Sequence, residues 1–209
     1  KNGYCEAFTR GWSELADMRL SDKDENECKT MNTHLHILEP YTNLYRVWKN
    51  DSLKSQLRNL IEIFIDKILN AETGHLELFF DENWNSKYRI VSYGHDIETA
   101  WLMDRGIEVL GDPKYEALLS PITKDLTAQI YKVAFDGHSL ANECEKGVVN
   151  THRIWWVQAE TVVGFLNGYE KDPSKTEYLE AAKSEWEFIK EHVIDHRTGS
   201  EWFWEVDPE

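Results

Sequence analysis

Two parts of the chain each carry a histidine and a glutamate three positions apart. His36 and Glu39 form one pair, and His95 and Glu98 form the other. Residues three apart share one face of a helix, so each glutamate can orient its neighbouring imidazole or bind a hydroxyl group. An imidazole with an ordinary pKa of about 6.5 can accept and donate protons near neutral pH. The two pairs therefore predict a site for general acid/base chemistry.

These pairs belong to a long internal repeat. The interval from His36 to His95 is nearly the same as the interval from Glu98 to Glu160, which lies in a third similar segment. A second amphipathic run follows each segment, with apolar residues at mixed spacings of three and four, over residues 52–70, 113–136 and 175–195. Each unit then closes with a glycine and a short alternating stretch, over residues 74–79, 137–142 and 199–204. The pattern predicts pairs of helices that end in small hairpins or extended loops.

Repeated helix pairs either stack into an open solenoid or close into a ring of inner and outer helices. The first helix of each pair is rich in His, Trp, Tyr, Asn and Glu rather than in plain aliphatic residues. Such helices suit the wall of a polar cavity better than a dry core, so we expect a toroid. Residues 3–8 match the closing stretches, which suggests a slice of a longer array. A partial ring would expose the flanks of its first and last repeats, so we expect reduced stability or self-association.

The three segments strongly resemble the cellobiose 2-epimerases of the N-acylglucosamine 2-epimerase superfamily, over residues 32–45, 92–102 and 155–160. The resemblance extends from Tyr4 to Trp204. It implies an all-α fold of the (α/α)6 barrel class, here a partial barrel of helix hairpins with short β hairpins or extended loops. Residues 1–209 would be a single domain that lacks the N-terminal and C-terminal parts of a longer protein. A second catalytic histidine would lie just after Glu209, and an active-site arginine would belong to the absent N-terminal part.

The reaction implied by the resemblance converts the reducing-end glucose of cellobiose, or of a related β-1,4-linked disaccharide, into mannose. After ring opening, the proton on C2 lies beside an aldehyde, so a base can remove it to give an enediolate. An acid on the opposite face can then return a proton with inverted configuration. The product is the 2-epimer of the sugar, so the protein would be a carbohydrate isomerase.

The resemblance also assigns roles to residues. Its expected catalytic residues are His95, His36 and Glu98. His95 would be a general acid/base with Glu98 as its orienter or as a ligand for a hydroxyl group, while His36 would bind the sugar and stabilise charge on the carbonyl oxygen. Trp155 and Trp156 point about 100° apart on a helix, and the resemblance selects Trp156 for the pocket. The expected substrate-binding residues from the resemblance are Asn32, Trp101, Trp156 and Glu160. Asp24 is added from its place in an acidic loop, which we expect near the mouth of the pocket, where it could reach a substrate.

The composition limits the partners. With 38 acidic against 23 basic residues, the formal charge of -15 would repel phosphate backbones, so we expect no nucleic-acid partner. No apolar stretch approaches the length of a membrane span. Cys5, Cys28 and Cys144 show neither metal-ligand spacing nor a disulfide framework, which indicates reduced thiols. We expect a cytoplasmic protein with no metal and no organic cofactor, monomeric when full length, that acts on a disaccharide or monosaccharide.

Two alternatives remain open. The same superfamily contains aldose-ketose isomerases and N-acylglucosamine 2-epimerases, although the residues at 33–36 and 93–96 favour the cellobiose branch. The chain could also be a non-catalytic carbohydrate-binding or protein-binding relative. A product assay would separate the enzymes from one another.

Overall fold

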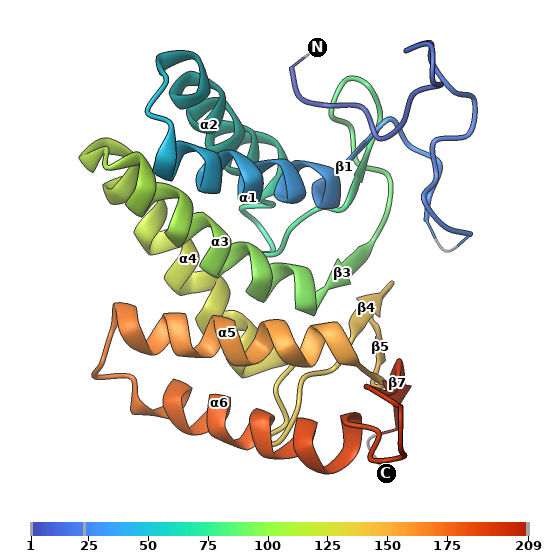
Figure 1. The fold of residues 1–209 in the computed structure, drawn as a ribbon, viewed down its shortest axis with the longest axis vertical. Coiled ribbons are helices and arrows are strands. Elements are labelled where there is room, and N and C mark those ends of the chain that lie inside the picture. Colours follow the sequence, from blue (N-terminus) through green and yellow to red (C-terminus); the bar gives the residue numbers. More distant parts are fainter. Residues whose placement is uncertain (1, 23, 208–209) are drawn as a thin grey trace.

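The computed structural model describes residues 2–22 and 24–207. Its α-helices follow one another as three pairs, which are α1 (Met31–Val47) with α2 (Asp51–Ile63), α3 (Tyr93–Leu110) with α4 (Pro113–Val133), and α5 (Trp155–Lys171) with α6 (Thr176–Phe188). Helix α3 packs between α1 and α5, and each of these three helices also packs against the second helix of its own pair (Figure 1). The first helices of the pairs therefore form an inner row, and the second helices lie outside it.

Local sequence signals mark where these helices begin and end. The Asn50 side chain caps α2 by accepting hydrogen bonds from two backbone N–H groups of its first turn. Helix α3 stops at Gly111, whose φ of 62° is left-handed and therefore suits glycine. Asp112 then caps α4, and Pro113 occupies its first turn, where a missing N–H costs nothing. The connections between paired helices are therefore short.

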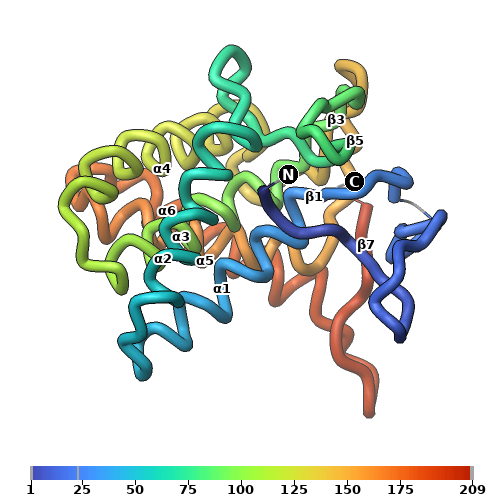
Figure 2. The backbone as a smooth tube through the Cα atoms, turned by 90° about the horizontal axis from the view of Figure 1, so that it is seen from above, coloured from blue at the N-terminus to red at the C-terminus, as the bar shows by residue number. Residues whose placement is uncertain are grey.

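One strand of a short antiparallel pair precedes each inner helix. Strands β1 (Lys29–Thr30), β3 (Ile90–Ser92) and β6 (Arg153–Ile154) run directly into α1, α3 and α5. Their respective partners are β2 (Phe79–Phe80), β4 (Glu143–Glu145) and β7 (Glu205–Val206), and β5 (Val148–Asn150) pairs with β4. Figures 1 and 2 show that these strands and the N-terminal segment all lie at the end where the inner helices begin.

The predicted closing hairpins are confirmed. Helices α2 and α6 continue into π-helical turns, η1 (Phe64–Ile68) and η2 (Ile189–Val193). Isolated antiparallel bridges then close each unit, between Leu69 and Leu76, Phe135 and Leu140, and Ile194 and Trp202. Each hairpin contains a glycine with positive φ, of 71°, 102° and 81°, at Gly74, Gly137 and Gly199. A side chain would be strained in that backbone region, which explains why glycine marks these turns.

The core fills the space between the two helix rows. Leu35, Leu38 and Leu57 are fully buried between α1 and its neighbours, while Ile97 and Phe165 are fully buried between α3 and α5. Other apolar side chains are exposed, including Leu44 and Val47 on α1 and Val163 and Leu166 on α5. No helix in the described part of the chain is long and apolar enough to cross a lipid bilayer.

Candidate active site

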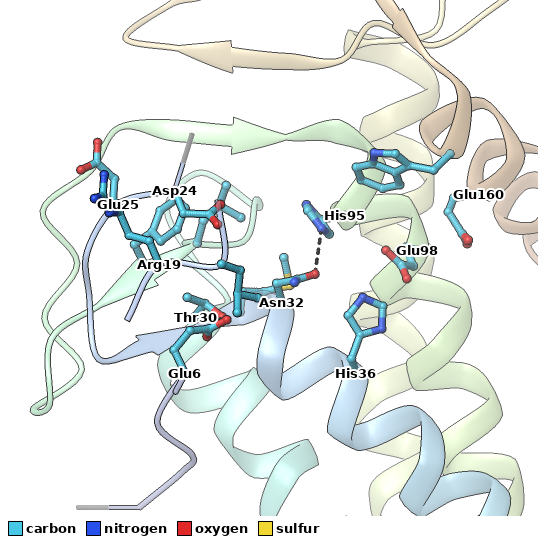
Figure 3. Close-up of a pocket in the computed structure, with 15 residues that line it drawn as sticks. Glu6, Arg19, Asp24, Glu25, Thr30, Asn32, His36, His95, Glu98 and Glu160 are labelled. Atoms are coloured by element: carbon cyan, nitrogen blue, oxygen red, sulfur yellow. Dashed lines mark hydrogen bonds between the residues drawn. The ribbon is translucent and has the colours of Figure 1, made fainter. Parts of the chain in front are cut away.

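A cavity of about 420 Å³ opens at the end where the inner helices begin. Its wall combines side chains from the first two turns of α1, α3 and α5 with side chains of the N-terminal segment (Figure 3). Seven of the eight residues that the sequence assigned to catalysis or binding line this cavity: Asp24, Asn32, His36, His95, Glu98, Trp156 and Glu160. The eighth, Trp101, is not among the lining residues.

The structure corrects the register of the repeat. Thr30, Ser92 and Ile154 each precede the first helical residue of an inner helix, and they are evenly spaced along the chain. His36, Glu98 and Glu160 follow them at one constant interval, so these three residues occupy equivalent positions in the second turn of their helices. His95 lies one turn closer to the start of α3. The pairing of His36 with His95 from the sequence therefore does not describe equivalent positions.

His95 is held by hydrogen bonds at both ring nitrogens. Its Nδ1 lies 2.8 Å from Ser92 Oγ. Its Nε2 lies 3.2 Å from Asn32 Oδ1, and Figure 3 shows this contact as a dashed line. The Trp156 ring packs beside the imidazole, with 4.7 Å between the ring centroids. Burial, together with the nearby charge of His36, lowers the pKa of His95 to about 4. The ring is therefore neutral at neutral pH, as a base must be.

Ser92 is a functional candidate that sequence reasoning missed. Thr30, its counterpart before α1, caps that helix by accepting a hydrogen bond from the Thr33 N–H at 3.0 Å. The Ser92 side chain makes no such cap and bonds to His95 instead. A serine cap commonly stabilises a helix by about 1 kcal/mol, so this hydroxyl forgoes that contribution. Asn32 Oδ1 can only accept, so these contacts fit a ring that donates from Nε2 and accepts from the Ser92 hydroxyl at Nδ1. A hydroxyl can also accept, so Ser92 can hold the other neutral tautomer when Nε2 is not donating to Asn32.

Two carboxyl groups face the same cavity, one on the buried Glu98 and one on the partly buried Glu160. Glu98 is 6% exposed, and its carboxyl group has no hydrogen-bond partner among the described residues. Burial, followed by the negative charges of Glu160 and Glu39, raises the pKa of Glu98 to about 8. Burial also raises the pKa of Glu160. At neutral pH, Glu98 is therefore a hydrogen-bond donor rather than an anion.

The contacts of His95 and Trp101 bear on two of the expected roles. Ser92 and Asn32 occupy both ring nitrogens of His95, so Glu98 is not the orienter of that imidazole. Trp101 donates its indole N–H to Glu160 Oε2 at 2.8 Å, and therefore orients a carboxyl group of the site instead of lining the cavity. Neither contact could be predicted from spacing, which identifies the helix face but not the direction in which a long side chain turns.

The two histidines of α1 point in different directions, as the helical period predicts for residues two positions apart. His36 is half exposed, and its Nδ1 lies 3.7 Å from Glu39 Oε2. His34 points the other way and is fully buried. Its Nδ1 donates to the Thr30 carbonyl at 2.6 Å, and its Nε2 accepts from the Tyr4 N–H at 3.0 Å. His34 is thus a structural residue that attaches the N-terminal segment to α1.

The N-terminal segment contributes cavity residues that the sequence did not indicate. Glu6 accepts hydrogen bonds from the hydroxyl groups of Thr30 and Thr33 at 2.6 and 2.7 Å. Arg19 and Glu25 line the cavity as well, and Arg19 is bound to the carboxylate of Asp17. These residues had no signal, because they belong to an irregular segment whose position depends on tertiary contacts.

The cavity wall is rich in acids and poor in fixed positive charge. Within the described lining, Arg19 is the only Lys or Arg, whereas five residues carry carboxyl groups: Glu6, Asp24, Glu25, Glu98 and Glu160. No group of three or more His, Cys, Asp or Glu side chains in residues 2–22 and 24–207 is placed to hold a metal ion. The described site therefore offers hydrogen-bonding groups and an imidazole base.

Comparison with solved structures defines the fold class. A sugar epimerase from a ruminal bacterium superposes with a TM-score of 0.93 at 41% identity, and the match covers 98% of this chain and 52% of that one. The predicted all-α architecture, a partial (α/α)6 barrel, is thereby confirmed. The family model for N-acylglucosamine 2-epimerase matches residues 7–209, and the chain belongs to this family.

Curated relatives agree with this assignment. A cellobiose 2-epimerase from Bacteroides fragilis is 52% identical over 99% of this chain and 53% of its own length. Another, from Dictyoglomus turgidum, is 40% identical over 98% of this chain and 52% of its own length. The chain thus spans about half the length of the curated relatives it matches.

Proposed function

We propose that the chain forms part of a carbohydrate epimerase that converts the reducing-end glucose of cellobiose, or of a related β-1,4-linked disaccharide, into mannose. The observation that carries this proposal is a partly buried, neutral imidazole at His95, fixed at the wall of a sugar-sized cavity. The relatives named cellobiose 2-epimerase support the choice of substrate. The location in the cytoplasm, the monomeric state and the single-domain organisation stay predictions.

His95 would act on the open-chain form of the sugar. Its low pKa keeps the ring neutral. With Nδ1–H donating to Ser92 and the contact with Asn32 released to the sugar, the Nε2 lone pair would take the proton from C2 while the electron pair moves into the carbonyl group to give an enediolate. Asn32 and His36, on the wall beside it, would stabilise the charge that develops on the carbonyl oxygen. Return of a proton to the other face of C2 gives the epimer. By the family resemblance, the group for that face would be a histidine just after residue 209.

The carboxyl groups would hold the hydroxyl groups of the sugar. A protonated Glu98 can donate to a sugar oxygen, which an ionised carboxylate cannot do. Glu160, fixed by Trp101, can bind a second hydroxyl. The Trp156 face beside His95 offers an apolar surface for the carbon face of the ring. Together these contacts would place C2 next to the imidazole.

The charge of the wall supports an uncharged sugar over a sugar phosphate. A phosphate group is usually bound by several cationic or N–H donors. Here five acidic side chains surround the described cavity, and its one guanidinium is already bound to Asp17. We therefore expect cellobiose to bind and phosphorylated hexoses to be rejected.

Proton exchange tests this function directly. The natural protein that contains this chain is incubated with cellobiose in D₂O, and the C2 position is followed by NMR. We expect deuterium at C2 together with a mannosyl product, both abolished by His95→Asn. His192→Asn, at a half-exposed position on η2, is the matched control and should leave both unchanged. Exchange that survives His95→Asn would overturn the role of His95, and a fructosyl product would indicate an aldose-ketose isomerase.

A further inference from the structure

Two cysteines that are distant in sequence meet beside the cavity. The sulfur atoms of Cys5 and Cys28 lie 3.0 Å apart, and the Glu6 N–H donates to the Cys28 carbonyl at 2.9 Å. Both cysteines are free and partly buried. Their backbones therefore run side by side, and their side chains point at one another. Sequence spacing gives no sign of this, because the two residues are 23 positions apart.

The geometry is close to that of a disulfide. A disulfide bond has a length of about 2.05 Å, so the two sulfurs would need to approach by only about 1 Å. The third cysteine, Cys144, lies on β4 next to Tyr93 and does not touch this pair. The pair is therefore set apart from the other thiol of the described chain.

We propose that Cys5 and Cys28 are a modification site, which a peroxide oxidant converts into a reversible disulfide that ties down one wall of the cavity. The segment between the two cysteines carries Arg19, Leu20, Asp24 and Glu25, all of which line the cavity. Figure 3 shows Arg19, Asp24 and Glu25 across the cavity from His95. A covalent bond at the base of this segment restricts how far the wall can move away from the helices.

The chemistry balances with hydrogen peroxide as the oxidant. Peroxide transfers one oxygen to a cysteine sulfur, which gives a sulfenic acid and one water. The neighbouring thiol attacks that sulfur, the S–S bond forms, and a second water leaves. A dithiol reductant reverses the step by exchange through a mixed disulfide. Burial raises the pKa of Cys28 to about 11, so the reaction should become faster as the pH rises and thiolate forms.

The bond would act mainly on the mobility of the wall. The segment is held largely by contacts within itself, such as the Asn26 amide that donates to the Ala16 carbonyl at 2.9 Å and accepts from the Met18 N–H at 2.9 Å. Its side chains are mostly exposed. Closing such a loop removes open conformations, so we expect amide exchange and tryptic cleavage after Arg19 to slow by on the order of tenfold.

Peptide mapping tests the proposal on the folded chain. After peroxide treatment, remaining thiols are alkylated and the chain is digested without reductant. The expected product is one peptide, residues 2–10, joined to another, residues 24–29, in the parent and in Cys144→Ser. Cys5→Ser and Cys28→Ser should lack it and should keep fast cleavage after Arg19 under oxidant. A mixture of disulfides that include Cys144, dimers linked between chains, or free Cys5 and Cys28 after oxidation would each overturn the proposal.

Discussion

Replacing Glu98 by glutamine isolates the effect of a buried carboxyl group on stability. Glu98 is 6% exposed and has no hydrogen-bond partner among the described residues, and its pKa rises from 4.5 to about 8. Because the folded chain binds this proton more tightly than the unfolded chain, the stabilisation is complete below pH 4.5 and is lost as the pH rises towards 8. Glutamine has a similar shape and does not titrate, so Glu98→Gln should remove this dependence.

The size of this loss of stability follows from the pH interval in which Glu98 is ionised in the unfolded chain but not in the folded chain. Each pH unit in that interval costs about 1.4 kcal/mol of stability. From about pH 5.5 to about pH 7.5, the parent should therefore lose about 2.5 kcal/mol relative to Glu98→Gln. This range avoids the isoelectric point near 5.0, where the chain is least soluble.

Urea unfolding followed by tryptophan fluorescence at both pH values measures this difference. Glu116→Gln, at an exposed position on α4, is the matched control and should follow the parent at both values. If the difference between the parent and Glu98→Gln stays constant with pH, Glu98 is ionised in the folded chain. Burial and the neighbouring acids would then not keep this carboxyl group protonated, and Glu98 would not act as a hydrogen-bond donor.

Three further predictions concern the imidazole and its surroundings. Ser92→Ala should lower the rate of C2 proton exchange about tenfold and alter the ¹⁵N chemical shifts of the His95 ring. Ser92→Thr retains the hydroxyl group, so it should keep the parent exchange rate and the parent ¹⁵N shifts. Identical ¹⁵N shifts in Ser92→Ala and the parent would contradict the hydrogen bond. The rate of C2 proton exchange should fall at low pH with a midpoint near pH 4, because the neutral form of His95 predominates above its lowered pKa. A midpoint near pH 6.5 would refute the lowered pKa. Gly94→Ala would place a Cβ 2.8 Å from the Trp156 ring, so thermal unfolding should show a loss of about 1–3 kcal/mol.

Most of the fold could be predicted because its signals are local. Apolar residues at spacings of three and four gave the helix pairs, and Gly74, Gly137 and Gly199 marked turns whose positive φ requires glycine. The predicted run at residues 113–136 became a helix that ends at Val133, which is within the usual error of helix ends. The runs at 52–70 and 175–195 each became an α-helix followed by a π-helical turn. That turn depends on the packing of the following hairpin and has no simple sequence period.

The sequence predicted which residues line the candidate site better than it predicted what each of their side chains contacts. Seven of the expected residues line the cavity. They could be predicted because helical spacing and family resemblance both indicate which face of each helix is functional. The partners of His95 were not predictable, since Asn32 belongs to another helix and Ser92 looks like an ordinary cap. The contact between Cys5 and Cys28 arises from the path of an irregular segment, which no periodicity encodes. Sequence patterns thus locate a face, and tertiary structure decides what each side chain touches.

The repeat explains how one scaffold can carry different chemistry at equivalent positions. Thr30, Ser92 and Ile154 all precede an inner helix, yet the first caps its helix, the second binds His95 and the third is buried in the core. One turn into α3, His95 takes a position that Val157 fills with a buried apolar side chain in α5. The backbone of each unit is already fixed by its strand pair, its glycine turn and its outer helix. The first turns of the inner helices therefore carry packing residues in one unit and acid/base groups in another, and the described cavity lies at this end of the helices.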